Sequence, residues 1–226
     1  MYRDLVHLIY PETCLSCEQE LSPKEDHLCG LCSNDLILTN FDQFEEPTSL
    51  DKLFWGRVEL ESTYAHFHFQ KNNGSQSLLF SLKYQNNPLI GHHFGAEIGQ
   101  RLKQSKGHNN FDAILPVPLH PKKKFIRGYN QSAAIAKGIH NYTGVRIYEN
   151  ILSRLKHGET QTSKNRFERH ANVQGQYALQ KFPKEIKHIL IVDDVITTGA
   201  TIETICALIK QQNPDVKISV AALAVA

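Results

Sequence analysis

The stretch ILIVDDVITTGAT, residues 189–201, indicates the fold class of this chain. Its first four residues, Ile189 to Val192, have the length and β-branching of a strand buried in a parallel sheet. Two aspartates follow, then a hydroxyl-rich turn, and the apolar spacing of residues 202–211 predicts a helix. A strand, a turn and a helix in this order are typical of an open α/β sheet, in which ligands bind at the carboxyl ends of the strands.

The turn itself has the composition of a ligand site. Asp193 and Asp194 can only accept hydrogen bonds when ionised, so they suit the hydroxyls of a ribose. The start of the following helix offers backbone N–H groups and hydroxyls to a phosphate. These features resemble the 5-phosphoribosyl-1-pyrophosphate (PRPP) loop of type I phosphoribosyltransferases. The resemblance implies a PRPP site formed here by Asp193, Asp194, Val195, Thr197, Thr198, Gly199, Ala200 and Thr201. The alternative is a strand that ends in a solvated acidic turn and a helix cap.

Composition sets further limits. With 226 residues, of which 41% are hydrophobic, the chain can bury the core of one ordinary domain and a small module. Its net charge of +2 favours neither nucleic acid nor membrane as a partner. The first residues lack the pattern of a secretory signal, and no apolar run has the length of a membrane span. A GxxxxGK[ST] sequence is also missing, which argues against a P-loop ATPase. We therefore expect a cytoplasmic protein without membrane insertion.

Four of the five cysteines form two CxxC pairs, Cys14/Cys17 and Cys29/Cys32, with eleven residues between the pairs. Two such turns can close a tetrahedral thiolate site around zinc. Because sulfur would take all four positions, such a zinc would be structural rather than catalytic. A pair of disulfides is the main alternative, but a cytoplasmic compartment would keep the thiols reduced. His27 is expected at the surface, and Cys206 in the core.

The order of the predicted elements suggests two units. Residues 41–51 have the proline and polar content of a connector, so we place a boundary near residue 50, between a module of residues 1–50 and a domain of residues 51–226. Residues 64–69 alternate as in a strand. Residues 77–102 contain apolar positions at helical intervals, interrupted at Asn87 and Pro88, which predicts two helices.

A second short apolar run, residues 113–117, reaches prolines that cannot continue a central strand. Three lysines, at positions 122 to 124, and Arg127 follow without an acidic residue among them, ahead of a helix predicted over residues 132–141. Arg127 can bind a phosphate with two parallel hydrogen bonds, and Gly128 lets the backbone approach closely. By comparison with phosphoribosyltransferases, Val117, Pro118, Leu119 and Arg127 would face the pyrophosphate of PRPP. For the lysines, a solvated charge run is the alternative.

Residues 154–175 are long, polar and basic, with little apolar periodicity. A long connection of this kind in a compact domain is often a binding lid, although it can also be an exposed loop. The basic side chains that such a lid would bring over the ligand are Arg154, Lys156, His157, Lys164, Arg166, Arg169 and His170, against Glu159 and Glu168.

Further motifs extend the resemblance to nearly the whole chain. They are the cysteine pairs, Leu82-Lys83-Tyr84, the PVPL segment from Pro116, RGYNQ from Arg127 to Gln131, and Thr160 and Thr162 with Arg166, Asn172 and Gly175. With VDDVITTGAT they resemble the ComF family of competence proteins, which includes GntX-type members. The resemblance implies an α/β fold: a parallel-sheet, type I phosphoribosyltransferase-like domain with a small N-terminal zinc-ribbon module that has four cysteine ligands. It also implies a role in DNA uptake during natural transformation.

Three functions follow as expectations. The first is a PRPP-binding protein in DNA uptake, with single-stranded DNA and a separate competence helicase as partners; its basic segments are interleaved with aromatic residues such as Phe125 and Tyr129. The second is a phosphoribosyltransferase that acts on a nucleobase or small amine, with Asp193 and Asp194 as catalytic residues and magnesium bound with PRPP. The third is a PRPP sensor without turnover. The sequence shows no pocket for an acceptor, so turnover stays open.

Overall fold

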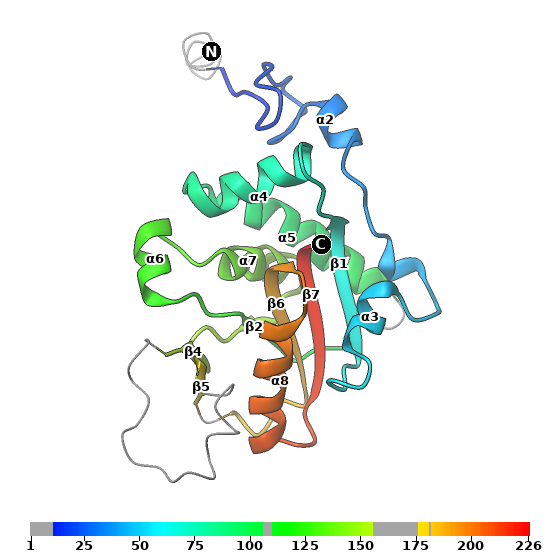
Figure 1. Cartoon of the computed structure of the whole chain (residues 1–226), viewed down its shortest axis with the longest axis vertical. Coiled ribbons are helices and arrows are strands. Elements are labelled where there is room, and N and C mark those ends of the chain that lie inside the picture. Colours follow the sequence, from blue (N-terminus) through cyan, green and yellow to red (C-terminus); the bar gives the residue numbers. More distant parts are fainter. Residues whose placement is uncertain (1–10, 106–109, 156–175, 181) are drawn as a thin grey trace.

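The computed structural model describes residues 11–105, 110–155, 176–180 and 182–226. Five strands form a parallel sheet in the order β1-β7-β6-β2-β3 (Figure 1). Their bounds are β1 Ser62–His68, β7 Lys217–Val225, β6 His188–Ile196, β2 Ala113–Pro116 and β3 Arg146–Ile147. The prediction of an α/β fold with a parallel sheet is therefore confirmed.

Apolar side chains cover both faces of the central strands. Ile189 and Val192 of β6 are fully buried, as their unbroken apolar run predicted. The strand expected at residues 64–69 is also present as β1, but Tyr64 and Phe67, on opposite faces, are both buried. The sheet edge is covered as well because Leu38 forms an isolated antiparallel bridge with Phe67.

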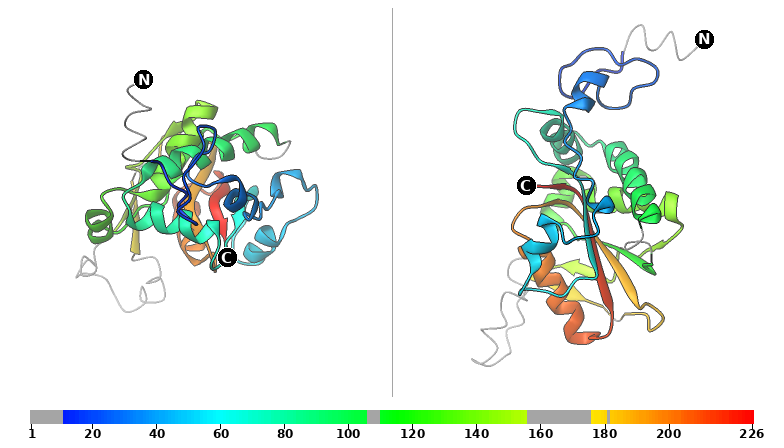
Figure 2. Two further views of the ribbon diagram at one scale, coloured as in Figure 1. Left: turned by 90° about the horizontal axis from the view of Figure 1, so that it is seen from above. Right: turned by 90° about the vertical axis from the view of Figure 1, so that its right-hand side faces the viewer.

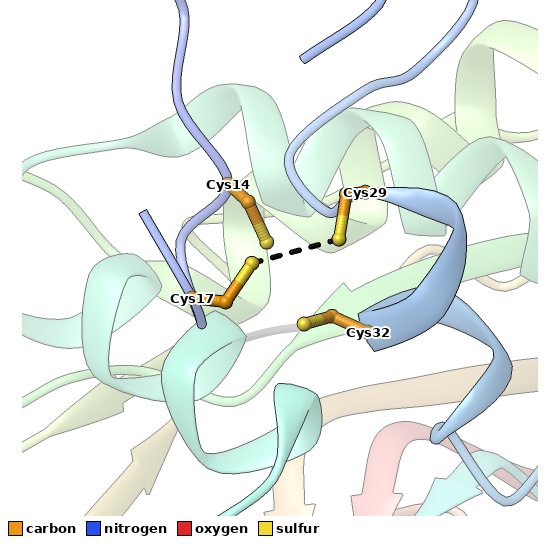
Figure 3. A group of neighbouring side chains, drawn as sticks. All are labelled: Cys14, Cys17, Cys29 and Cys32. Atoms are coloured by element: carbon orange, nitrogen blue, oxygen red, sulfur yellow. Dashed lines mark hydrogen bonds between the residues drawn. The ribbon is translucent and has the colours of Figure 1, made fainter. Parts of the chain in front are cut away.

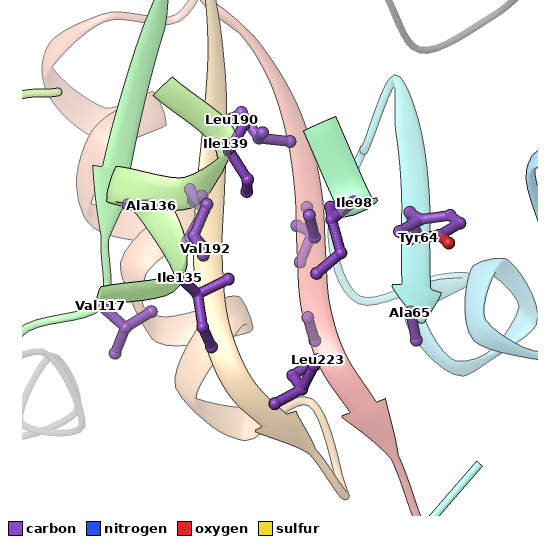
Figure 4. Packing of buried hydrophobic residues seen from close by; sticks show 14 of the residues in the cluster. Tyr64, Ala65, Ile98, Val117, Ile135, Ala136, Ile139, Leu190, Val192 and Leu223 are labelled. Carbon is purple, nitrogen blue, oxygen red and sulfur yellow. The ribbon is translucent and has the colours of Figure 1, made fainter. Parts of the chain in front are cut away.

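Helices lie on both faces of the sheet (Figure 2). One face carries α5 (Pro88–Gln104) and α7 (Gln131–Thr143), and the other carries α3 (Ser49–Phe54) and α8 (Ala200–Gln212). Figure 4 shows Ile135 and Ile139 of α7 close to Val192 and Leu190 of β6. These contacts fix β6 and therefore the position of the motif at its carboxyl end.

Helices α5 and α7 pack backbone to backbone because glycines line their contact. A methyl group at Gly95 would overlap the carbonyl oxygen of Ile135, and one at Gly138 would overlap the carbonyl oxygen of His92. At Gly91 the added carbon would lie 2.7 Å from the Cβ of Ala134. Close helix packing therefore depends on the absence of side chains at these positions.

Helix α4 (Gly74–Tyr84) precedes α5, so the two helices predicted around the Asn87-Pro88 break are confirmed. The basic run after β2 forms a short exposed helix, α6 (Pro121–Arg127), which Gly128 ends in the left-handed conformation at φ 80°. The remaining elements are α2 (Gly30–Asn34), η1 (Phe41–Gln43) and an antiparallel pair, β4 (Leu152–Arg154) with β5 (Tyr177–Leu179).

Other expectations have mixed outcomes. Cys206 is buried on α8, as expected. His27 is only half exposed, because its ring meets the edge of His93 at 5.4 Å. The domain boundary near residue 50 stays a prediction; residue 50 lies within α3, whose N-terminus is closed by a capping box between Thr48 and Asp51. Within the described part of the chain, no helix combines the length and apolarity needed to cross a membrane.

Candidate functional site

The two aspartates of the motif occupy the last part of β6 rather than a turn after it. Asp193 and Asp194 belong to the strand, which continues to Ile196 at the carboxyl edge of the sheet. Asp193 Oδ1 accepts hydrogen bonds from Ser132 Oγ, at 3.1 Å, and from the Asp194 backbone N–H, at 2.9 Å. Ser132 lies in the first turn of α7, so packing of α7 on the sheet brings the hydroxyl to the carboxylate.

Burial and, to a smaller extent, the neighbouring Asp194 carboxylate raise the pKa of Asp193 to about 7. The hydrogen bonds from the Asp194 amide and Ser132, together with the charge of Lys83, act in the opposite direction. A carboxyl group poised near neutral pH can ionise when a ligand brings new hydrogen-bond donors.

Lys83 completes the polar cluster from the end of α4. Its Nζ lies 3.3 Å from Asp194 Oδ2, and both side chains are mostly buried. The Tyr129 hydroxyl donates a hydrogen bond to the Leu82 carbonyl oxygen, which ties α4 to the segment before α7. In the sequence, Lys83 was notable only as part of the Leu82-Lys83-Tyr84 motif, and no role was predicted for it. Its approach to Asp194 joins residues far apart in the chain and has no local signal.

The loop between β6 and α8 has the geometry of an anion cradle. Gly199 is the N-cap of α8 with φ 73°, and having no side chain it caps none of the first amides of the helix. Residues Thr197, Thr198, Gly199, Ala200 and Thr201 line a small hollow of about 40 Å³ together with Asp193, Val195, Ile196 and Ile202. Helix N-termini of this kind bind phosphate through backbone N–H groups.

Helix α3 and the residues after it support this loop from behind. The Phe54 ring fills the space beside Gly199, where an added Cβ would lie 2.6 Å from the ring. Arg57 Nη1 donates to the Thr198 carbonyl oxygen at 2.8 Å, and its guanidinium pairs with Glu203 of α8 at 2.5 Å. No local pattern in the sequence indicates this support, because Arg57 belongs to no motif.

A polar hollow of about 220 Å³ adjoins the loop. The predicted residues that line it are Val117, Pro118, Leu119, Arg127, Asp193, Asp194, Val195 and Thr201. Lys123 and Arg127 reach it together because they are four residues apart on α6. Lys122 and Lys124 are exposed and do not line it. The structure thus brings the residues of the two predicted segments into two adjoining hollows.

Of the basic segment predicted as a lid, residues 154–175, only the first two residues are described. Arg154 and Tyr177 line the polar hollow, with the Arg154 guanidinium 5.4 Å from the centre of the Tyr177 ring. The rest of that segment lies outside the described residues, and with it the positions Lys156, His157, Glu159, Thr160, Thr162, Lys164, Arg166, Glu168, Arg169, His170, Asn172 and Gly175.

An apolar pocket of about 300 Å³ opens on the other side of Lys83. It shares Lys83, Val195 and Thr197 with the two polar hollows. Its remaining lining residues are mainly apolar: Phe69, Gln76, Leu79, Phe80, Tyr84 and Ala226. The rings of Phe80 and Tyr84 are more than half exposed and lie 5.2 Å apart. The sequence had indicated no such pocket because its residues come from α4, β6 and the ends of β1 and β7.

The four N-terminal cysteines form a second candidate site (Figure 3). Their sulfur atoms all lie within 4.8 Å of one another, and the Sγ atoms of Cys17 and Cys29 are 3.6 Å apart. A tetrahedral zinc with Zn–S bonds of about 2.3 Å would place its sulfurs about 3.8 Å apart. The cysteines are free thiols, so the alternative of two disulfides is not what the structure shows. Cys14, Cys17, Cys29 and Cys32 are positioned to bind a metal ion.

Ionisation of these thiols also favours a cation. Burial raises the pKa of Cys14, but backbone N–H groups of Cys29, Cys17 and Ser16 outweigh it and lower the value to about 6. Burial and the sulfurs of Cys17 and Cys29 raise the pKa of Cys32 to about 12. The Cys14 thiolate therefore forms readily and the Cys32 thiolate does not, unless a metal ion compensates the accumulated negative charge.

The module rests on the N-terminus of α4. A Cβ at Gly74 would lie 2.9 Å from the Cys32 carbonyl oxygen and 3.0 Å from the Leu28 side chain. Asn73, the N-cap of α4, also donates to the Asp35 carbonyl oxygen at 3.4 Å. The same helix therefore carries the cysteine module at one end and Lys83 at the other.

The chain is similar to known proteins over most of its length. Residues 139–225 match the phosphoribosyl transferase domain family. The chain is 24% identical to competence protein F of Haemophilus influenzae over 92% of its length and 89% of that protein. It is 25% identical to the DNA utilization protein YhgH of Shigella flexneri, over 89% of this chain and 92% of the relative.

Competence protein ComFC of Streptococcus pneumoniae is 27% identical over 63% of the chain and 60% of that protein. These similarities confirm the resemblance to ComF proteins that the motifs indicated. The chain is a homologue of competence protein F, ComFC and YhgH that carries a phosphoribosyl transferase domain and an N-terminal cluster of four cysteines.

Proposed function

We propose that this protein binds PRPP together with magnesium and acts in DNA uptake or utilisation in the cytoplasm. The observation that carries the proposal is the continuity of the site: an aspartate pair, the N-terminus of α8 and a basic hollow adjoin one another at the carboxyl ends of the strands. This order matches the ribose, 5-phosphate and pyrophosphate of PRPP. The setting in DNA metabolism rests on the names of the relatives, which are competence and DNA utilization proteins.

Each group of residues has a defined part in this proposal. Asp193 and Asp194 accept hydrogen bonds from the ribose hydroxyls, and the loop from Thr197 to Thr201 donates to the 5-phosphate. Lys123 and Arg127 attract the pyrophosphate together with the backbone of residues 117–119. Magnesium, held mainly by PRPP oxygens and water, would neutralise charge on the pyrophosphate. In this proposal the protein contributes position and charge rather than a covalent nucleophile.

Thermal unfolding tests this site. A ligand that binds only the folded protein raises the melting temperature, so PRPP with magnesium should do so. Asp193→Asn combined with Asp194→Asn should abolish the shift, whereas Asp215→Asn, an exposed carboxylate away from the site, should retain it. The site assignment is wrong if millimolar PRPP leaves the melting temperature of the unaltered protein unchanged.

Single-stranded DNA is the proposed macromolecular partner, alongside a separate helicase. Helix α6 presents Lys122 and Lys124 next to Phe125, whose side chain is 90% exposed. Lysines for phosphate and an exposed ring for base stacking are the two elements of sequence-independent DNA binding. Affinity for an oligonucleotide should fall steeply as salt rises. Phe125→Ala should weaken binding several-fold without changing the PRPP response, and salt-independent affinity would contradict a phosphate-contacting surface.

The cysteine cluster is proposed to hold structural zinc. Four sulfur ligands leave no position for a substrate, and the thiolate chemistry described above favours a soft divalent cation. Elemental analysis of protein purified without chelators should find one zinc per chain. Less than half an equivalent would contradict the assignment.

The apolar pocket favours a second function, transfer of the phosphoribosyl group to an aromatic acceptor. A flat ring between Phe80 and Val195 would lie next to the ribose site, because the pocket shares Lys83 with the polar hollow, Thr197 with the loop hollow and Val195 with both. Aromatic and apolar walls suit a nucleobase. Release of pyrophosphate from PRPP in the presence of individual nucleobases tests this function. Tyr84→Ala should reduce turnover, and the absence of release with every base tried would leave binding of PRPP as the function of the site.

A further inference from the structure

A hollow of about 760 Å³ lies away from the proposed PRPP site. It is enclosed by η1, the segment that follows it, α3, the amino end of β1 and the end of α5. The hollow lies at the amino end of β1, whereas the proposed PRPP site lies at the carboxyl ends of the strands. The two sites are therefore at opposite ends of the parallel strands. We call the hollow the acidic pocket.

Its lining is strongly negative although the whole chain is slightly basic. Five carboxylates line it, and no lysine or arginine among the described residues does: Asp42, Glu45, Glu46, Asp51 and Glu61. Three of them have partners within the protein: Asp51 closes the capping box of α3, Glu61 pairs with Lys217 at 2.9 Å, and Asp42 pairs with Arg101 at 3.4 Å. Glu45 and Glu46 are exposed and have no ion pair within the described residues.

Asp42 provides independent support for a ligand. Its side chain is only 9% exposed, so its charge has lost most of its water. Oδ2 is 3.4 Å from Arg101 Nη1, whereas Oδ1 has no hydrogen-bond donor among the described residues. A buried carboxylate oxygen without a donor is costly. A cationic group in the pocket would lie beside this residue and offset the cost of its buried negative charge.

Two exposed aromatic side chains stand among these carboxylates. Phe44 is 61% exposed and Trp55 is 62% exposed, and both line the pocket. Large exposed rings are unusual on a surface that meets only water, and they are enriched where proteins bind other proteins. A guanidinium or ammonium group can stack on such a ring and at the same time pair with a neighbouring carboxylate.

We propose that the acidic pocket binds an arginine- or lysine-rich peptide segment of a partner protein. Its volume and its separated carboxylates exceed what a single amino group needs, so several side chains of one segment would be held. Nucleic acid is a poor occupant because its phosphates would face unpaired carboxylates. The protein thus has two charge-selective surfaces: a basic one beside the PRPP site for anionic ligands, and an acidic one for a cationic protein segment.

Trp55 allows a direct test, because it is the single tryptophan of the chain and lies in the pocket. The probe is an octapeptide of alternating arginine and alanine, acetylated and amidated at its ends, and the comparison peptide replaces arginine by glutamate. The arginine peptide should change the Trp55 fluorescence saturably, and the glutamate peptide should not. Isothermal titration calorimetry should give the same affinity.

Charge variants locate the site. Glu45→Gln with Glu46→Gln should weaken binding at least tenfold, and Asp42→Asn should weaken it several-fold. The matched control, Glu149→Gln with Glu185→Gln, makes the same change in net charge at exposed positions outside the pocket and should bind as the unaltered protein does.

Three results would overturn the proposal. One is the absence of saturable binding by both fluorescence and calorimetry. Another is equal weakening by the control pair, which would show only general attraction to a negative surface. The third is binding of spermidine as tight as that of the peptide, which would identify the pocket as a site for a free polyamine.

Discussion

The cysteine module and the parallel-sheet domain are stabilised in different ways. In the module, α2 buries none of its residues, and the described residues before η1 contribute few apolar side chains to the core, mainly Leu21 and Leu28. In the sheet domain, β6 and β7 are buried over nearly their whole length. A short segment cannot bury enough apolar surface to offset its loss of chain entropy. We therefore expect the proposed metal to stabilise the module, whereas the sheet domain has a core of its own.

Removal of the metal gives the largest expected difference between the two regions. Structural zinc contributes on the order of 10 kcal/mol to the folding of small zinc modules. A chelator should therefore remove hydrogen-exchange protection from the amides of residues 11–36 and leave β6 and β7 protected. Cys14→Ser should act in the same way without chelator. Simultaneous loss of protection in both regions would show that the sheet domain depends on the module.

A methyl group added between α5 and α7 should destabilise the sheet domain and leave the cysteine module unchanged. Gly95→Ala pushes a carbon into the Ile135 carbonyl group, and overpacking of this kind costs about 3 kcal/mol. Gly99→Ala should cost less, since its nearest atoms are 3.2 Å away. Urea unfolding measures both. The zinc content should stay unchanged, and an effect of Gly95→Ala below that of Gly99→Ala would contradict the packing argument.

The site at the sheet edge should respond to pH through Asp193. Its folded pKa of about 7 lies above the unfolded value of about 3.9, so the folded state holds the extra proton and this group's contribution to stability falls as pH rises between those values. Ribose hydroxyls require the ionised form. PRPP affinity should therefore rise about tenfold from pH 6 to pH 8 on account of Asp193.

The phosphates of PRPP also titrate near pH 6, so the control is the same titration of Asp193→Asn. The variant should show only the contribution of the phosphates. If PRPP affinity depends on pH equally in the variant and the unaltered protein, ionisation of Asp193 does not contribute to binding. The cysteine module should not change its zinc content over this range, because metal binding keeps its thiols ionised.

The smallest expected effect concerns the support behind the phosphate loop. The Arg57–Glu203 pair is partly exposed, so Arg57→Ala should cost about 0.5–1 kcal/mol of stability. PRPP affinity should fall two- to threefold because the Thr198 carbonyl group loses its donor. Lys52→Ala, an exposed position on α3, is the control for both measurements. An unchanged PRPP affinity in Arg57→Ala would show that the loop holds its shape without this bond.

Local sequence patterns predicted much of the frame of the site. The apolar run of β6, the helix after it and the break between α4 and α5 were all readable because each depends on neighbouring residues. The spacing of the cysteines likewise predicted their cluster. The composition of residues 41–51 suggested only a connector. In the structure, most of these residues line a pocket together with the segment after α3, the end of α5 and the start of β1.

What the sequence by itself determined is the order of the elements and the chemistry at the end of β6, since periodicity, turn residues and metal-ligand spacing act over short distances along the chain. Only the tertiary structure decided that Lys83 meets Asp194, that Ser132 donates to Asp193 and that Arg57 supports the loop. It also decided the apolar and acidic pockets. These contacts join residues far apart in sequence, and they form only when burial of the sheet and its helices brings distant segments together.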